Sequence, residues 1–185
     1  MKIGFTCSTF DLFHAGHVAM LKEARRQCDY LIVGLQTDPT LDRPYEKNKP
    51  IQSVFERFVQ IDACKYIDEI VVYSTEKELI DIFLSYPIDI RILGIEYQSR
   101  DFTGKIECQD RGIEFYFNDR KHSFSTTELR QRVYNIEKTR LDQIKEASKV
   151  IDKQPIAYYN SSPVIKESIK DFDNEFEEHA WQKKR

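Results

Sequence analysis

The sequence is short of the residues that mark several classes of protein. Its 185 residues include only 6 Gly and 6 Pro, which excludes a low-complexity or collagen-like chain. The 4 Cys are widely separated and form no C-x-x-C pair, so we expect reduced thiols rather than a disulfide framework or a zinc finger. A run of about 18 apolar residues is also missing, which argues against membrane insertion.

An excess of charge of one sign is lacking as well. The 28 basic and 31 acidic side chains leave a net charge of −3, which argues against a surface that coats nucleic acid. Residues 1–5 lack the apolar stretch of a secretory signal. Together with the expected reduced thiols, these observations predict a cytoplasmic protein without a nucleic-acid partner.

Short apolar runs alternate with stretches of helical apolar spacing. The runs that we expect to be buried strands are residues 2–6, 30–36, 69–73, 89–94 and 113–117. The stretches that we expect to be helices are residues 18–28, 54–65 and 76–85. Such alternation predicts a Rossmann-like α/β fold: a doubly wound, parallel, five-stranded sheet with helices on both faces. Ligands of such sheets bind beyond the carboxyl ends of the strands, so we expect function in the loops there.

Two regions fall outside this alternation. The loop 37–53 is rich in Pro and charge, which is typical of a functional lid. From about residue 126 the apolar spacing predicts one long helix or two short ones, followed by an acidic stretch at 171–178. We therefore expect a first domain over residues 1–135 and a helical extension with an acidic tail over 136–185. An oligomerisation arm, a second small domain and a disordered extension all fit that second part.

The segment after the first expected strand holds two histidines three residues apart. His14 and His17 lie at the start of an expected helix and share one face of it, while Gly16 between them has no Cβ. A helix amino terminus offers unpaired N–H groups and the positive end of its dipole, so the segment suits a phosphate. Ordinary capping is the alternative, and a metal site lacks further ligands at suitable spacing.

This segment resembles the H-x-G-H nucleotidylyltransferases, in particular the cytidylyltransferase branch typified by glycerol-3-phosphate cytidylyltransferase. Four further stretches are similar to motifs of that family and follow in the same order. They are Ser8-Thr9-Phe10-Asp11; the strand ending in Thr37-Asp38, with Lys49 and Arg57 after it; Lys65-Tyr66-Ile67-Asp68-Glu69; and Arg120 with Ser125-Thr126-Thr127.

The resemblance implies an enzyme that transfers CMP from CTP to a small phosphorylated alcohol and releases pyrophosphate. It also implies Mg²⁺ on the triphosphate and a homodimer. The residues to which it assigns catalysis are His14, His17, Lys49 and Arg120. It extends the nucleotide site to Thr9, Phe10, Arg57, Gly94, Glu96, Ser125, Thr126 and Thr127.

The acceptor is expected to be glycerol 3-phosphate or a similar polyol phosphate. A thiol at Cys7, where choline- and ethanolamine-phosphate relatives carry an aspartate, argues against a cationic acceptor. The candidate acceptor residues are Cys7, Asp11, Asp38, Tyr97, Arg100 and Lys105. Two alternatives stay open: an adenylyltransferase of the same fold that uses ATP, and a non-catalytic regulatory protein that binds a nucleotide.

Overall fold

The structure is a computed structural model that describes residues 1–119 and 124–153, the last four of these by their backbone only. Its elements follow the order β1 (Ile3–Ser8), α1 (Ala15–Arg25), β2 (Tyr30–Gln36), α2 (Val54–Asp62), β3 (Glu69–Tyr73), α3 (Glu76–Ser85), β4 (Ile90–Gly94), η1 (Ile95–Tyr97), α4 (Lys105–Asp110), β5 (Glu114–Asn118) and α5 (Thr126–Lys153). The chain divides into two units, the first over residues 1–132 and the second beginning at Val133.

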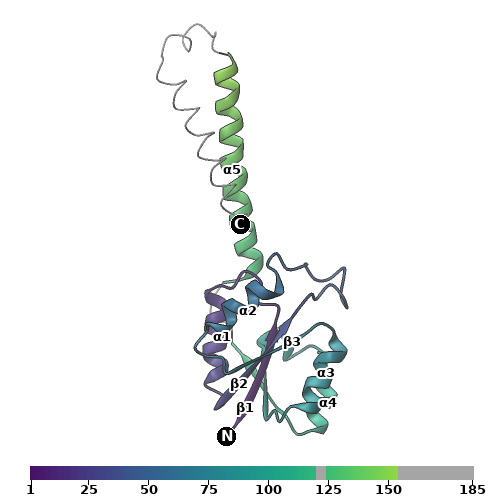
Figure 1. Ribbon diagram of the computed structural model, residues 1–185. Helices are drawn as coiled ribbons and strands as arrows, with labels where there is room; N and C mark the ends of the chain where they lie inside the picture. The colour runs from purple at the N-terminus through teal and green to yellow at the C-terminus, as the bar shows by residue number, and fades with distance from the viewer. Residues whose placement is uncertain (120–123, 154–185) are drawn as a thin grey trace, which may run out of the picture. The chain divides into compact units, whose positions relative to one another are not determined.

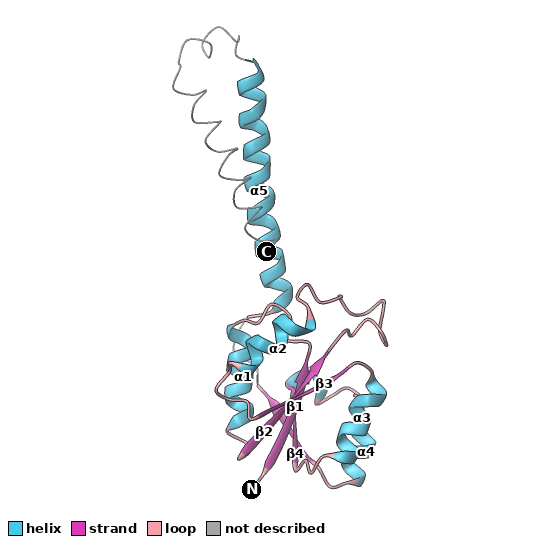
Figure 2. Cartoon of the chain, viewed as in Figure 1, coloured by secondary structure: helices cyan, strands magenta, loops and turns pink. Residues whose placement is uncertain are grey.

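The five strands form one parallel sheet in the order β3-β2-β1-β4-β5. This is the predicted doubly wound sheet, with α1 and α2 on one face and α3 and α4 on the other (Figures 1 and 2). Because β1 is central and the chain winds outward from it in both directions, the strand order reverses between β1 and β4. A crevice is expected at that position.

Each face of the sheet carries its own apolar core. Leu21 of α1 and Ile61 of α2 belong to the cluster on the first face. Leu79 and Phe83 of α3 and Cys108 of α4 belong to the cluster on the second. All five of these side chains are at most 4% exposed, so both faces of the sheet are buried. This burial accounts for the nearly continuous apolar runs in the sequence.

The helices begin at local signals in the sequence. Ser53 and Glu56 form a reciprocal capping box at the start of α2, and the Thr75 hydroxyl accepts from the Glu78 N–H at the start of α3. The short helix α4, which the sequence pattern did not predict, starts at Gly104, whose φ of 76° lies in the left-handed region.

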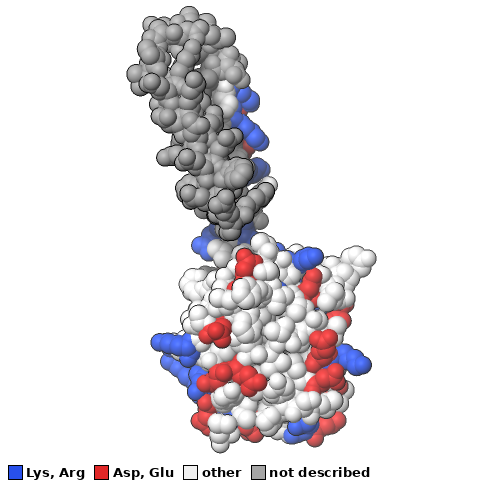
Figure 3. Space-filling view, in the orientation of Figure 1, with Lys and Arg blue, Asp and Glu red and all other residues white. Residues whose placement is uncertain are grey.

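The second unit begins within α5, which is a single helix rather than two short ones. The acidic stretch 171–178 lies outside the described residues. None of the helices in the described part of the chain is both long and apolar enough to span a membrane. On the face of the first unit shown in Figure 3, acidic and basic side chains are interspersed.

Candidate active site

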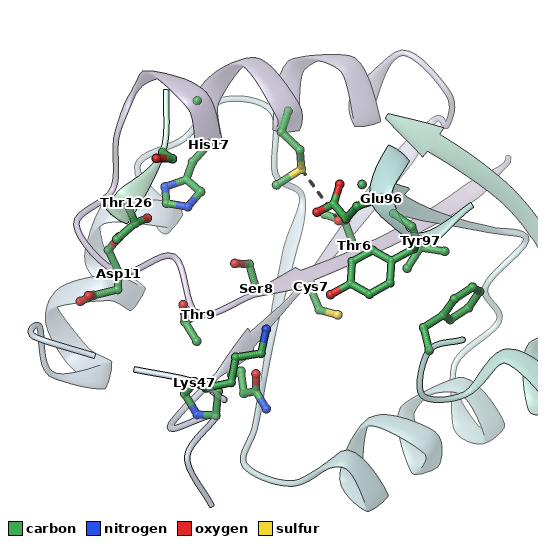
Figure 4. A pocket seen from close by; sticks show the side chains of 18 of the residues that line it. Thr6, Cys7, Ser8, Thr9, Asp11, His17, Lys47, Glu96, Tyr97 and Thr126 are labelled. Carbon is green, nitrogen blue, oxygen red and sulfur yellow. Dashed lines mark hydrogen bonds between the residues drawn. The ribbon is translucent and has the colours of Figure 1, made fainter. Parts of the chain in front are cut away.

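A cavity of about 840 Å³ opens at the carboxyl ends of the strands, and all five strands contribute to its lining. The remaining walls come from the starts of α1, α3 and α5, the loop before α2, and the segment between β4 and α4. Figure 4 shows His17 and Thr126 on one wall, Ser8 and Thr9 at the end of β1, and Glu96 with Tyr97 on another wall. The cavity therefore lies where the strand order reverses, as expected for this fold.

The two histidines cap the helix that carries them. The Gly16 N–H donates to His14 Nδ1 at 3.0 Å, and the His14 N–H donates to His17 Nδ1 at 3.4 Å. Since each Nδ1 accepts a hydrogen bond, we assign the proton of each neutral imidazole to Nε2. Capping thus selects the tautomer that can donate from Nε2, so capping and phosphate binding are compatible in one residue pair.

Aromatic rings hold the two imidazoles in place. The His14 and His17 rings stack with their centroids 4.0 Å apart, and Phe13 stacks on His17 at 5.6 Å. The fully buried ring of Phe10 packs 5.3 Å from His17. The role predicted for Phe10 belongs to its backbone N–H and stays a prediction, while its side chain belongs to the core.

Gly16 lies where a larger residue would collide with the protein's own side chains. A Cβ at Gly16 would lie 2.8 Å from Cε1 of His14 and 3.0 Å from Cβ of Phe124. The space beside this glycine is therefore filled by the protein's own rings, and any larger residue would push the His14 ring out of its capping position.

The start of α5 brings hydroxyl groups to the same wall. Ser125, Thr126 and Thr127 all line the cavity. The Ser125 hydroxyl accepts from the Glu128 N–H at 3.1 Å, which is the predicted cap, and Thr126 Oγ1 lies 3.2 Å from His14 Nε2. Two helix amino termini, those of α1 and α5, thus meet at this wall and create a field that favours an anion.

Asp11 lies between these helices, and its carboxylate is 4% exposed. It accepts the N–H groups of Ile51 and Gln52, each at 3.0 Å, and a hydrogen bond from the Arg130 guanidinium. Burial alone would raise the pKa of Asp11, but the hydrogen bonds from Gln52, Arg130 and Ile51 outweigh it and hold that pKa below its ordinary value. Asp11 was predicted to bind the acceptor. It lines the cavity, but its carboxylate accepts hydrogen bonds from two backbone N–H groups and from Arg130 of the protein itself.

Arg57, predicted to bind the nucleotide, does not reach the cavity. Its side chain is 1% exposed, and Nη1 donates to the carbonyls of Thr9 at 2.8 Å and Gln36 at 2.7 Å. Nη2 donates to Thr37 O at 2.6 Å. The prediction is corrected on physical grounds, because these carbonyls already occupy the guanidinium.

The loop before α2 supplies a cation to the cavity, but the residue is Lys47 and not the predicted Lys49. Lys47 lines the cavity and points into it in Figure 4, whereas the exposed Lys49 does not line it. Lys49 instead contributes its carbonyl, which accepts from Arg130 at 3.2 Å. Arg120 lies outside the described residues, so its predicted role stays a prediction.

The end of the cavity beside the segment after β4 brings together two candidate acceptor residues, Cys7 and Tyr97, and two candidate nucleotide-binding residues, Gly94 and Glu96. Cys7, Gly94, Glu96 and Tyr97 line the cavity there, and the Tyr97 hydroxyl points toward Cys7 in Figure 4. The Tyr97 ring packs edge-on against Phe102, with centroids 6.1 Å apart. This end of the cavity combines a carboxylate, a thiol and aromatic rings.

Three of the predicted acceptor residues lie away from the cavity lining. Asp38 accepts from both the N–H and the hydroxyl of Thr40, at 2.9 and 2.6 Å, and so closes a turn. Lys105 lies 3.7 Å from Asp101, and Arg100 is exposed in the loop before α4. In this structure the three charges therefore belong to a turn, a loop and a helix start, and their predicted contact with the acceptor stays a prediction.

Three arginines of the lining, Arg43, Arg91 and Arg130, were missed from the sequence, and Arg43 pairs with Glu76 at 2.7 Å. Arg130 lies one helical turn after Thr126, so helical spacing places both on one face of α5. Arg91 is a charged residue within the apolar run of β4. It is 3% exposed, stacks between Phe83 and Phe102 at 4.3 and 4.9 Å, and donates to Thr103 O at 2.6 Å. A charge in a buried strand was the signal that could have marked it.

Comparison with known proteins shows that the chain is similar to cytidylyltransferases. A probable ethanolamine-phosphate cytidylyltransferase of Encephalitozoon cuniculi is 51% identical over 134 residues, which cover 71% of this chain and 40% of that protein. The ethanolamine-phosphate cytidylyltransferase of Arabidopsis thaliana is 34% identical over 101 residues, 55% of this chain and 24% of that protein. The chain therefore spans less than half the length of these relatives.

A solved structure shares the fold. The lipopolysaccharide core biosynthesis protein of Thermoplasma volcanium superposes with a TM-score of 0.53 at 22% identity, covering 67% of this chain and 99% of that one. The Cytidylyltransferase-like family model matches residues 5–132, which include all of the sheet except the first two residues of β1 and every cavity residue named above. With the family model matching well over half of its length, the chain belongs to the cytidylyltransferase-like family.

Proposed function

We propose that the protein transfers CMP from CTP to a small phosphorylated alcohol, forming a CDP-alcohol and pyrophosphate. The observation that carries the proposal is the convergence of Nε2 donors from His14 and His17 with the α5 hydroxyls and Lys47 on one cavity at the strand ends. These groups are donors and cations, which is the set that a triphosphate requires.

The proposed reaction is a displacement at the α-phosphorus of CTP. An oxygen of the acceptor phosphate forms a new bond to that phosphorus, and the bond to the bridging oxygen of the β-phosphate breaks, so that pyrophosphate leaves. Because the attacking oxygen is already anionic near neutral pH, the step needs no general base. Catalysis then consists of positioning two anions and of stabilising the charge that develops on the phosphoryl oxygens.

His17 and His14 would donate to phosphate oxygens from Nε2, and the stacked rings fix the direction of both donors. The α5 hydroxyls at residues 125–127 would hold the outer phosphates. Mg²⁺ would enter with the triphosphate and neutralise part of its charge, since the described residues contain no cluster of three or more acidic, His or Cys side chains suited to a metal.

For the acceptor, we propose ethanolamine phosphate, with glycerol 3-phosphate as the competing candidate. The printed names of two relatives support an ethanolamine acceptor. The Glu96 carboxylate and the Tyr97 ring line the end of the cavity beside Cys7, and this combination suits an ammonium group. The thiol at Cys7 favours the glycerol compound, as argued from the sequence.

Pyrophosphate release tests the proposal directly. The protein is assayed with CTP or ATP against ethanolamine phosphate, choline phosphate and glycerol 3-phosphate. We expect turnover with CTP and the highest kcat/KM with ethanolamine phosphate. A preference for glycerol 3-phosphate would overturn only the acceptor, and a preference for ATP would favour the adenylyltransferase alternative.

The non-catalytic alternative is tested by thermal shift in the same buffers. A nucleotide at 100 times its Kd stabilises the folded state by about 2.7 kcal/mol. A shift with CTP but no pyrophosphate with any acceptor would contradict the proposed enzyme and favour a regulatory protein. We also propose a homodimer, which sedimentation of the full chain tests.

A further inference from the structure

One carboxylate joins three segments that are far apart in the sequence. Asp11, in the turn before α1, accepts the N–H groups of Ile51 and Gln52 from the loop before α2. It also accepts from Arg130 in the first turns of α5. The connection is reciprocal, because Gln52 Oε1 accepts the Leu12 N–H at 2.7 Å.

Arg130 holds the loop at a second point. Its guanidinium donates to the Lys49 carbonyl at 3.2 Å while it pairs with Asp11, and its side chain is 26% exposed at the cavity wall. Thr126, one turn earlier on α5, donates its hydroxyl to the Asp11 carbonyl at 3.4 Å. We call the Asp11–Arg130 ion pair with these backbone contacts the clasp.

The segments that the clasp joins are those that carry the phosphate-facing groups. Lys47 precedes the held carbonyl of Lys49 by two residues, Thr126 precedes Arg130 by one turn, and His14 follows Asp11 by three residues. Each of these three groups lines the cavity, and no two of them lie in the same helix or strand. Their relative positions therefore depend on contacts between the segments.

A buried ion pair contributes little net stability, because desolvation of the two charges offsets their attraction. The pair instead fixes geometry, because the planar guanidinium and the two backbone N–H groups together restrict the position and orientation of the Asp11 carboxylate. The Arg57 guanidinium of α2 also interacts electrostatically with Asp11.

We propose that Asp11 and Arg130 are positioning residues, and that the clasp sets the distance between the Lys47 segment, the α5 hydroxyls and the two imidazoles. The clasp thereby controls both the affinity for the triphosphate and the rate of transfer. This inference rests on the proposed function, but it makes a claim about loop order that does not depend on turnover.

The test uses Asp11→Asn, Arg130→Met, the double variant and Arg130→Lys in the full chain. We expect each single neutral variant to raise the Kd for CTP at least about tenfold and to lower kcat, since hydrogen bonds to charged groups contribute about 1.5–3 kcal/mol each. The double variant should resemble the singles rather than their product, because both changes open one clasp. Arg130→Lys should recover part of the affinity.

Loop order is read without nucleotide by the rate of tryptic cleavage after Lys47. The neutral variants should be cut several-fold faster than the wild type, and CTP should protect the wild type more than the variants. If Asp11→Asn does not fold, Arg130→Met and Arg130→Lys decide the question. The matched control is Glu114→Gln, which removes the 2.8 Å ion pair with Lys2 at the amino ends of the strands, opposite the cavity, and should leave all values unchanged.

Unchanged cleavage, Kd and kcat in folded variants would overturn the inference, as would a loss of stability with wild-type Kd and kcat at a temperature where the variants are folded. If the wild type releases no pyrophosphate with any acceptor, the proposed function fails, while the cleavage rates and the CTP affinity still judge the clasp. The two failures are therefore distinguishable.

Discussion

Replacing Arg57 by methionine should destabilise the protein severely while leaving its nucleotide chemistry largely in place. The guanidinium is 1% exposed and donates to carbonyls at the ends of β1 and β2 over distances of 2.6–2.8 Å, with further contacts of 3.2 and 3.3 Å to Gln52 and Ser53. Methionine fills much of the same volume but leaves these carbonyls without their donor.

The magnitude follows from the three short bonds. Each buried carbonyl that loses its partner costs about 1–3 kcal/mol, and partial entry of water reduces the sum. We therefore expect a loss of about 4 kcal/mol in the free energy of unfolding, which is within the range for breaking a buried charged contact. In a domain of this size the Tm should fall by roughly 10–20 °C.

Urea unfolding followed by far-UV circular dichroism measures this loss. Arg140→Met is the control, because that arginine is 65% exposed in an i,i+3 pair with Glu137 and should change stability by less than about 0.5 kcal/mol. An Arg57→Met protein that loses less than about 1 kcal/mol, yet binds CTP much more weakly, would refute the structural role and restore the nucleotide-binding prediction.

Three further changes should separate chemistry, backbone strain and charge. Substituting His17→Ala should lower kcat by at least about a hundredfold, in steady-state assays of a protein with an unchanged dichroism spectrum, and a near-wild-type kcat would remove His17 from the mechanism. Gly104→Ala should lower the free energy of unfolding, measured with urea, more than Gly112→Ala does. Both glycines have a positive φ, 76° and 71°, but only at Gly104 would a Cβ collide with the Phe83 ring, at 2.7 Å. Equal losses would show that backbone strain alone matters. Because the folded-state pKa of Asp11 is lowered, its contribution to stability is present above the ordinary value of 3.8 and is lost as pH falls below it. Asp11→Asn should abolish that part of the acid dependence of the unfolding free energy, and an identical pH profile in the variant would contradict the assignment.

The fold was predictable because its signals are local or periodic. Both faces of the sheet are covered, so its strands are apolar runs, and the strands lie close to the predicted ranges. The short helix α4 was missed because its six residues, Lys105–Asp110, are too few to establish a helical period.

The site was predictable only where one short segment contains it. His14 and His17 lie in a single turn, so their spacing alone placed them together. The roles of Arg57 and Asp11 depend on which distant segment reaches them, and a charged residue in a sequence gives no sign of whether it faces a ligand or its own backbone. Which of Lys47 and Lys49 reaches the cavity depends on how the loop is held by contacts with distant segments, and the sequence pattern does not show those contacts.

The join between β1 and β4 is narrow, with only two registered pairs, Gly4 with Ile90 and Phe5 with Arg91, against six between β1 and β2. The cavity spans this seam, since its lining includes Cys7 on one side and Gly94 on the other. A substrate that contacts both residues would link β1 and β4, the two strands that share the fewest registered pairs. We therefore expect a bound substrate to slow amide hydrogen exchange in β4 more than in β2, so that the protein becomes more rigid on binding even where its shape stays the same.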